Sequence, residues 1–551
     1  MTYHSFDTTS TPTRHTWCAW VVFAVIWFGA LGHNVLIHSD EGRYATLSLG
    51  MLQSGDWLSP RLNGLLYFEK PVLPYWLGAL SFQWFGINEF AARLWPALAG
   101  FLSIGLVGLT ANRLWGREAG NLSAMVMGSS CWVVLNSHFL NLDTGLMAFL
   151  TLSLCSFLLA QREDAGQSAR RSWMWLCWAG MAGATLSKGL IGIAIPGAVL
   201  VLYSLLFRQF AFWRRLHLVS GLIVLLLLTA PWFIQVSLKN PGFAHFFFIH
   251  EHVERFLTTE HRRSGPFWYF VPYLLVGFMP WVTLLPPILS QGLRREGRGQ
   301  MQPDRLLLVW AVFVFLFFSK SGSKLPSYIL PMFPALALLA GHLLSRQRPA
   351  WLLKHLLVPV LFWLSLLVAT FFVQRWVSPD TPLAVLRPLA HYTALGALTF
   401  LLGAACAWRF LALERLTAAV IALSLASLAS LTLIQVGYNP YAQLKSSKEI
   451  VAMLKPTPDT EVFSVRYYDQ TLPFYLHRDV VLVDYVDEFE LGEKTEPTRW
   501  IPTLDGFAVR WRAAHRALAM MAGDTYQQLK AQGLPMQIVY QDPRRMVVAK
   551  P

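Results

Sequence analysis

Long runs of apolar residues, separated by short polar segments, occupy the chain from residue 17 to residue 437. These runs approach the roughly 20 residues that a helix needs to cross about 30 Å of hydrocarbon. The pattern predicts about thirteen transmembrane helices, at 17–37, 91–112, 119–136, 139–160, 172–187, 189–207, 216–236, 267–289, 306–319, 326–345, 351–374, 388–408 and 416–437. We therefore expect a polytopic α-helical membrane domain over residues 1–437.

The loops between these spans alternate in charge. One set is short and rich in arginine, as in the loops that contain Arg113, Arg170 and Arg294. The other set is either very tight or long and mixed in charge, as at residues 38–90 and 237–266. Because positively charged loops stay in the cytoplasm, we expect the N-terminus inside, and both long loops and the C-terminal tail outside.

Residues 438–551 have a different sequence pattern, in which short β-branched and aromatic runs alternate with stretches of helical character. This alternation is typical of a small soluble α/β domain, which we place on the outer face. We expect its strands at 462–468, 480–486, 538–540 and 546–548, and its helices at 509–521 and 524–532.

Composition agrees with a membrane protein and argues against other classes. Hydrophobic residues make up 55% of the chain and charged residues only 14%, against about a quarter charged in an ordinary soluble domain. The net charge of +14 comes mostly from the short loops, where topology and anionic lipid explain it, so we expect no nucleic-acid partner. The five cysteines lie in or beside the spans without CxxC spacing, which argues against disulfides and a zinc–thiolate site.

Two aspartates lie where outer segments meet spans. Asp40, followed by Glu41, comes just after the first span, and residues 41–53 have helical apolar spacing that ends at a predicted helix stop, Ser54-Gly55-Asp56. Asp143 begins a later span and has no basic residue within fifteen positions. Each carboxylate is either a helix cap that accepts backbone N–H bonds or one of a catalytic pair at the mouth of a membrane cavity. The residues alone leave both interpretations open.

Histidines and a glutamate in the two long loops are candidate metal ligands. The second loop contains His250 and His252, each followed by further charged residues. If this segment is helical, it forms a surface ladder of ion pairs at i,i+4. If it is extended, the two histidines share a face and can bind a divalent metal such as zinc, with Glu69 as a third ligand.

Basic residues recur on the outer side, where topology does not require positive charge. Individual lysines at a membrane edge often extend to lipid headgroups. Convergence of several from separate loops instead indicates an anionic ligand, most simply a phosphate. The residues concerned are Lys70, Lys188, Arg255, Lys320 and Lys324.

Several motifs resemble those of the type C glycosyltransferases, polytopic enzymes that use polyprenyl-phosphate-linked sugars. Within them the chain is similar to the 4-amino-4-deoxy-L-arabinose lipid A transferases of Gram-negative inner membranes. The acidic opening is shared with protein O-mannosyltransferases, whereas the Phe-Glu-Lys-Pro and Lys-Leu-Pro-x-Tyr stretches are more specific. The matching segments are Asp40–Ala45, Ser54–Trp57, Tyr67–Pro71, Lys188–Gly189 and Lys324–Pro331.

The resemblance implies a donor, an acceptor and roles for the residues. The donor is undecaprenyl phosphate carrying aminoarabinose, and the acceptor is a lipid A phosphate at the periplasmic side of the inner membrane. The added amine weakens attraction of polymyxin and other cationic peptides. Asp40 and Asp143 are then the catalytic carboxylates, and Glu69 with His250 lies near a metal or near the carrier phosphate. The expected substrate-binding residues are Glu41, Arg43, Lys70, Lys188, Arg255, Lys320, Lys324 and Tyr328.

Two other functions remain open at this point. A protein O-glycosyltransferase shares the fold but modifies serine or threonine. A lipid transporter or flippase is a different class, and it tolerates loss of the Asp40 charge. We expect the protein to be a monomer.

Overall fold

The computed structural model describes residues 14–254, 265–294 and 301–551, with the backbone alone described at 14–16 and 250–254. The described chain divides into two compact units. The first unit comprises residues up to 31, 95–371 and 392–435. The second unit comprises residues 32–94, 372–391 and 436–551. Its long outer loop and C-terminal tail, distant in sequence, thus fold together.

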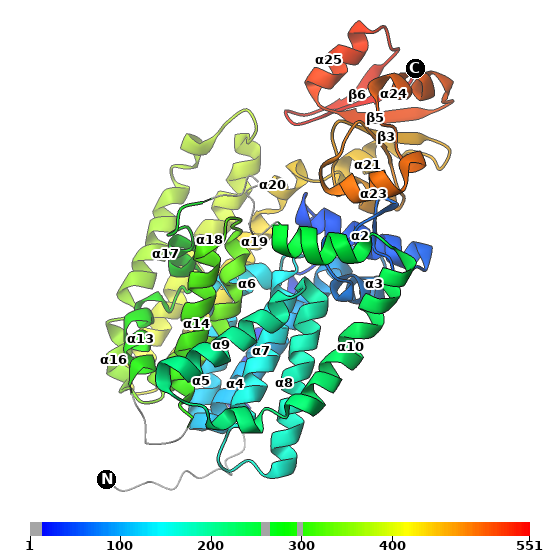
Figure 1. Ribbon diagram of the computed structural model, residues 1–551. Helices are drawn as coiled ribbons and strands as arrows, with labels where there is room; N and C mark the ends of the chain where they lie inside the picture. The colour runs from blue at the N-terminus through cyan, green and yellow to red at the C-terminus, as the bar shows by residue number, and fades with distance from the viewer. Residues whose placement is uncertain (1–13, 255–264, 295–300) are drawn as a thin grey trace, which may run out of the picture. The chain divides into compact units, whose positions relative to one another are not determined.

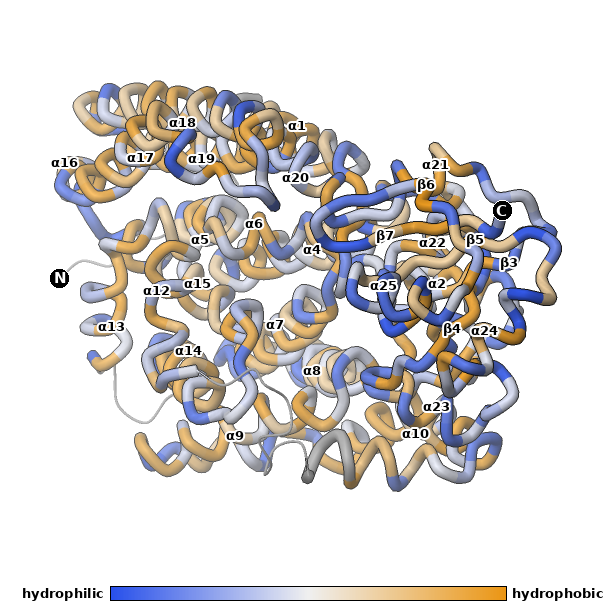
Figure 2. Tube along the Cα trace, turned by 90° about the horizontal axis from the view of Figure 1, so that it is seen from above, coloured by the Kyte–Doolittle hydropathy of each residue, from blue (hydrophilic) through white to orange (hydrophobic). Residues whose placement is uncertain are grey.

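Helices fill the predicted membrane region, and a described helix lies in every predicted span. Their colours in Figure 2 show mainly hydrophobic residues along α17 and α19. Among the described residues, seven helices are long and apolar enough to cross a membrane, or eight if a bent pair is counted as one span, so a multi-pass protein is confirmed and the count of thirteen is not. The helices are α1 (Arg14–Gly29), α4 (Glu89–Trp115), α5 (Arg117–Ser129), α6 (Cys131–Ser137), α7 (Asp143–Ala160), α8 (Gln167–Lys188), α9 (Ile191–Phe207), α10 (Leu218–Lys239), α12 (Phe270–Gly277), α13 (Leu285–Leu293), α14 (Pro303–Lys320), α15 (Phe333–Leu344), α16 (Pro349–Leu353), α17 (Leu357–Thr370), α18 (Leu383–Ala412) and α19 (Leu416–Gly437).

Two predicted spans are broken. The span at 119–136 divides into α5 and α6 at Ser130, whose backbone is extended, and the next amide, of Cys131, donates to Met279 O at 3.1 Å. The span at 267–289 bends by 109° between α12 and the helical segment 282–293. Pro280 lies in this bend and has no amide proton to continue the helical ladder.

Close packing of α7 against α8 fixes the position of the polar residues at their ends. These helices lie side by side in Figure 1 and are joined by a short turn. A Cβ atom added at Gly180 would lie 2.6 Å from the backbone nitrogen of Ser153, and one at Gly183 would lie 2.4 Å from the Phe149 ring. Only glycine allows this approach. Because the helices run antiparallel, the first residue of α7 and the last of α8 share one end of the pair.

The second unit begins with the long outer loop. Its helices are α2 (Asp40–Ser54) and α3 (Leu73–Phe85), with a small hairpin of β1 (Arg61–Leu62) and β2 (Leu65–Leu66) between them. The predicted helix and its stop are confirmed, since α2 ends at Gly55 in a left-handed conformation with φ of 69°. Gly55 supplies this backbone at no steric cost.

A five-stranded mixed sheet forms the core of the C-terminal tail. Its strand order is β4-β3-β5-β7-β6, with β3 parallel to β4 and β5 and the last two strands antiparallel. The predicted α/β character is therefore confirmed. The elements are α20 (Asn439–Leu444), α21 (Lys448–Leu454), β3 (Glu461–Val465), α22 (Leu472–Leu476), β4 (Val481–Val483), α23 (Glu490–Thr495), α24 (Leu504–Ala513), β5 (Ala517–Met521), α25 (Gly523–Ala531), β6 (Gln537–Gln541) and β7 (Met546–Ala549).

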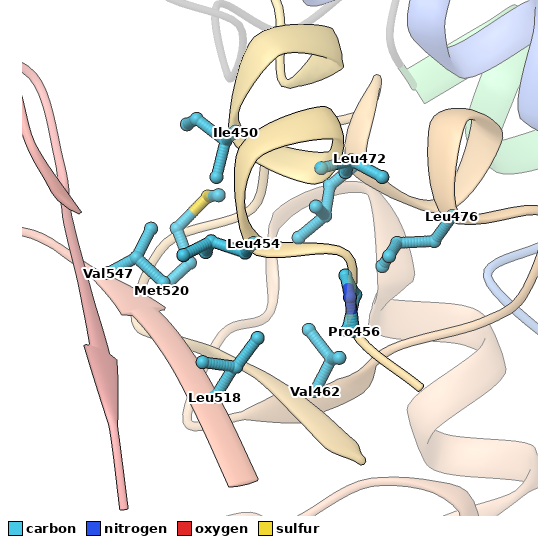
Figure 3. Close-up of a pocket in the computed structure, with 10 residues that line it drawn as sticks. Ile450, Leu454, Pro456, Val462, Leu472, Leu476, Leu518, Met520 and Val547 are labelled. Carbon is cyan, nitrogen blue, oxygen red and sulfur yellow. The ribbon is translucent and has the colours of Figure 1, made fainter. Parts of the chain in front are cut away.

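One predicted helix of this domain is wrong. The stretch 509–521 is helical only to Ala513, and its second part is the central strand β5. Alanine, leucine and methionine favour helix locally, but here they fill the middle of a sheet, between β3 and β7. Figure 3 shows Leu518 and Met520 of β5 lining a small apolar pocket with Leu454 of α21. Burial in the sheet has overridden the local preference.

The outer loop and the sheet domain contact each other directly. A Cβ added at Gly42 would lie 2.6 Å from the carbonyl carbon of Gln470, so α2 touches this backbone. Thr46 Oγ1 donates to Gln470 O at 3.0 Å. The Asn63 side chain donates to Val480 O and accepts from Val480 N, both at 2.8 Å. The sheet domain thus supports the helix that begins at Asp40.

Glu493 on α23 gives the second unit a pH-dependent stability. Its side chain is 4% exposed, and its Oε1 has no partner among the described residues. Burial, with a smaller contribution from Glu490, raises its pKa to about 7. In the unfolded chain the pKa of a glutamate is about 4.3. Glu493 therefore contributes its full stabilisation below about pH 4.3, and this stabilisation is lost as the pH rises through about 7.

We therefore expect the melting temperature to decrease as the pH rises from about 4.5 to about 7.5. Glu493→Gln should make this decrease smaller. Thermal unfolding of the purified protein in detergent at several pH values measures the difference between variant and parent. Glu449 is exposed, so Glu449→Gln is the matched control. Its melting temperature should change with pH by as much as that of the parent. An unchanged slope in Glu493→Gln would contradict the assignment.

Candidate active site

Asp40 opens the helix that follows the first span. It is the first residue of α2, and the cap position belongs to Ser39, which makes no side-chain capping bond. The Asp40 side chain is 35% exposed and lies 3.5 Å from Arg43 Nη1. Asp40 is therefore not the N-cap, and its partly accessible carboxylate borders a buried cation.

Glu41 points into the protein and is held by Arg93 of α4. Arg93 donates from Nε to Glu41 Oε1 at 2.6 Å and from Nη2 to Oε2 at 2.7 Å. The same guanidinium donates to the carbonyls of Asn34 and Val35 at 2.6 and 2.9 Å. This buried ion pair fixes the chain on both sides of Asp40. The substrate-binding role of Glu41 stays a prediction.

Arg43 is held by a residue that sequence reasoning missed. Glu488, just before α23, accepts from Arg43 Nη2 at 2.9 Å and from Nε at 3.3 Å. Gln470 Nε2 also donates to Glu488 at 3.1 Å. Burial raises the pKa of Glu488, although Arg43 opposes this shift. No local pattern marks Glu488, since its partner lies 445 positions away.

Tyrosine rings surround this pair of charges. Tyr67 and Tyr75 are buried and Tyr44 is half-buried, and burial raises the pKa of all three phenols. Tyr44 and Tyr75 stack with centroids 6.3 Å apart. Glu69 lies close enough to raise all three pKa values further. The predicted Asp40 and Glu69 therefore border one aromatic, acidic environment.

Lys70 follows Glu69 and is half-buried. Its ammonium donates to the backbone carbonyl of Glu69 at 2.7 Å. This contact turns the side chain back along its own loop. Its predicted role toward a phosphate stays a prediction.

The first unit contains a second polar cluster, built around Asp143. Asp143 is the first residue of α7 and is 6% exposed. One carboxylate oxygen pairs with Nζ of Lys188, the last residue of α8. Ser327 Oγ donates to the other oxygen at 2.7 Å. The Lys188 ammonium also lies 4.4 Å from the centroid of the Tyr328 ring. The structure thus brings three of the predicted residues together.

The remaining predicted lysines of this unit lie at the end of α14 and in the turn that joins it to the 3₁₀ helix η4 (Pro326–Met332). Lys324 is 7% exposed, and its ammonium donates to Ser321 O at 2.6 Å. Lys320, at the end of α14, is exposed. This segment therefore presents one buried and one exposed cation.

The second long loop carries the histidines predicted to bind a metal. The backbone over His245–Glu254 is a π-helix, which is the helical rather than the extended of the two conformations that the sequence left open. Packing of Phe247 against Phe233 and Phe243 holds this segment to α10. No group of three or more potential metal ligands occurs in the described part of the chain. The side chains of both histidines, and all of Arg255, lie outside the described residues, so their roles stay predictions.

In each of the two units, a carboxylate lies beside a cation at the end of a helix. Together with the helical membrane fold, these pairs fit a membrane glycosyltransferase. Residues 14–247 match the family model described as dolichyl-phosphate-mannose-protein mannosyltransferase. Residues 449–550 match the model described as aminoarabinose transferase C-terminal domain.

Individual relatives narrow the class to one family. The crystal structure of ArnT from Cupriavidus metallidurans bound to undecaprenyl phosphate is 37% identical, with a TM-score of 0.93, over 98% of this chain and 99% of that one. The chain therefore belongs to the aminoarabinose transferase (ArnT) family.

Curated arabinosyl transferases agree over a shorter region. The undecaprenyl phosphate-α-4-amino-4-deoxy-L-arabinose arabinosyl transferase of Erwinia tasmaniensis is 35% identical over 60% of this chain and 59% of its own length. That of Pseudomonas aeruginosa strain UCBPP-PA14 is 36% identical over 61% and 60%. The chain thus spans about three fifths of these relatives. An oligosaccharyltransferase structure from Archaeoglobus fulgidus, 13% identical with a TM-score of 0.50, shares the fold alone.

Proposed function

We propose that this protein transfers 4-amino-4-deoxy-L-arabinose from undecaprenyl phosphate to a phosphate group of lipid A, at the periplasmic face of the bacterial inner membrane. Membership of the ArnT family supports the reaction class. The observation that carries the proposal within this chain is the partly exposed Asp40 carboxylate, fixed between the buried Glu41–Arg93 pair and the Arg43–Glu488 pair.

The donor sugar carries an amine, which is a cation near neutral pH. Asp40 and Glu69 supply negative charge, and the stacked Tyr44 and Tyr75 supply aromatic faces. Carboxylates and ring faces are the groups that attract an ammonium ion. We therefore infer that this environment selects an aminosugar over a neutral pentose.

The reaction breaks the bond between the anomeric carbon and the carrier phosphate, and a lipid A phosphate oxygen forms the new bond to that carbon. The carrier phosphate leaves with the electron pair, so negative charge grows on it. A cation such as Lys70 stabilises this charge in the transition state. A nearby carboxylate such as Asp40 stabilises an oxocarbenium-like centre. The acceptor phosphate is already anionic and needs no strong base.

The direct test uses purified protein in detergent with aminoarabinosyl undecaprenyl phosphate and lipid A. We expect lipid A to gain the mass of one or more aminoarabinose residues. A second arm offers a mannosyl polyprenyl phosphate and a serine- or threonine-containing peptide, since residues 14–247 match the protein mannosyltransferase model. Glycosylated peptide with unchanged lipid A would replace the proposal with that alternative.

A further inference from the structure

Ser327 has no role in the reaction as proposed above, yet it contacts one of its predicted carboxylates. Its hydroxyl donates to Asp143 Oδ2 at 2.7 Å, while Lys188 pairs with Oδ1. The two carboxylate oxygens are therefore held by groups from two different elements, η4 and the end of α8. A carboxylate with one partner can turn about its side-chain bonds, whereas one held at both oxygens keeps a single orientation.

The next residue, Tyr328, completes the arrangement. Its ring lies 4.4 Å from the Lys188 ammonium, a distance at which an aromatic face attracts a cation. Adjacent residues of η4 thus contact both members of the Asp143–Lys188 pair. Ser327 holds the anion and Tyr328 covers the cation.

The backbone of η4 is fixed on both sides of Ser327. Trp132 Nε1 of α6 donates to Pro326 O at 3.0 Å. Ile329 and Leu330, two and three positions later, are fully buried. Ser327 therefore does not follow Asp143 passively, because its own position is set by the packing of α6 and of the η4 side chains.

From this geometry we propose that Ser327 is a positioning residue for Asp143: its hydroxyl orients the carboxylate and thereby places the Lys188 ammonium against Tyr328. The inference rests on the proposed function, and it takes Asp143, predicted from the sequence as a catalytic carboxylate, to act in that reaction. Ser327 need not touch the substrate itself. Its effect passes through the orientation of Asp143.

Removal of the hydroxyl should act on turnover more than on binding. Loss of a hydrogen bond to a charged group corresponds to roughly a 10- to 100-fold change in rate when the bond is needed in the transition state. We expect Ser327→Ala to lower kcat of aminoarabinose transfer by about tenfold or more, with KM for the polyprenyl donor changed by less than about threefold and the melting temperature unchanged. Ser327→Thr keeps the hydroxyl and should restore most of kcat.

Ser323→Ala is the matched control. It makes the same chemical change four positions earlier, in the turn before η4, at a hydroxyl that has no partner among the described residues, and it should keep the parental kcat. Asp143→Asn is measured in parallel. If Asp143→Asn loses transfer while Ser327→Ala keeps the parental kcat, or if Ser327→Thr fails to restore it, the positioning role is wrong and the proposed function stands. If Asp143→Asn itself retains parental transfer, the role proposed for Asp143 fails, and the role of Ser327 with it.

Discussion

Asp40→Asn is expected to abolish detectable aminoarabinose transfer, a loss of at least about 100-fold in kcat, which is the typical cost of removing one preorganised electrostatic group. The substitution keeps the shape of the side chain and removes only its charge. That charge borders Arg43 and the tyrosine environment in which we place the cationic sugar. The measurement is the mass shift of lipid A in a timed reaction with purified protein.

Folding of the variant must be shown separately. The Asp40 side chain is 35% exposed, and an ion pair as long as 3.5 Å at such a site contributes little to stability, so the melting temperature should match the parent. Asp505→Asn is the matched control, because Asp505 is an exposed acidic residue in the first turn of α24. It should transfer aminoarabinose at the parental rate. Substantial turnover by a folded Asp40→Asn protein would refute the catalytic role.

Arg93→Met is expected to have the largest effect on stability. The ion pair with Glu41 is almost completely buried, with side-chain exposures of 5% and 1%. Removal of one partner from such a pair leaves an uncompensated buried charge and costs about 3–5 kcal/mol. It also deprives the carbonyls of Asn34 and Val35 of their donor. Thermal unfolding in detergent should show a markedly lower melting temperature, and transfer should fall because the start of α2 is no longer held.

Two comparisons test the reason for this effect. The double variant Glu41→Leu/Arg93→Met removes both charges and should recover part of the stability, because apolar groups can replace a buried pair. Lys494→Met breaks an exposed pair with Glu490, whose side chains are 70% and 55% exposed, and such pairs are worth only about 0.5 kcal/mol. Equal losses in Arg93→Met and Lys494→Met would show that burial of the pair is not the cause.

Local patterns were sufficient for many of the helices. The apolar run at 139–160 predicted α7, and the spacing of residues 41–53 predicted α2 with its stop at Gly55. These features depend on neighbours within one or two turns, so the sequence records them directly. The same local logic failed at 517–521, where a helical composition forms the central strand β5.

Residues that act across long separations were beyond local reasoning. Glu488 lies 445 positions from Arg43, and Ser327 lies 184 positions from Asp143. A serine or glutamate in a polar turn carries no signal of its partner. The predicted pairing of His250 and His252 likewise required an extended backbone, whereas this backbone is helical in the structure.

The sequence by itself determined that this is a multi-pass membrane protein with carboxylates and cations at the ends of its spans, because hydrophobic length and charge asymmetry are properties of consecutive residues. Only the tertiary structure decided which of those charges meet. Close packing of α7 on α8 brings Lys188 to Asp143, and docking of the sheet domain on α2 brings Glu488 to Arg43. Such contacts are set by the shape of packed surfaces, which no segment of the chain contains alone.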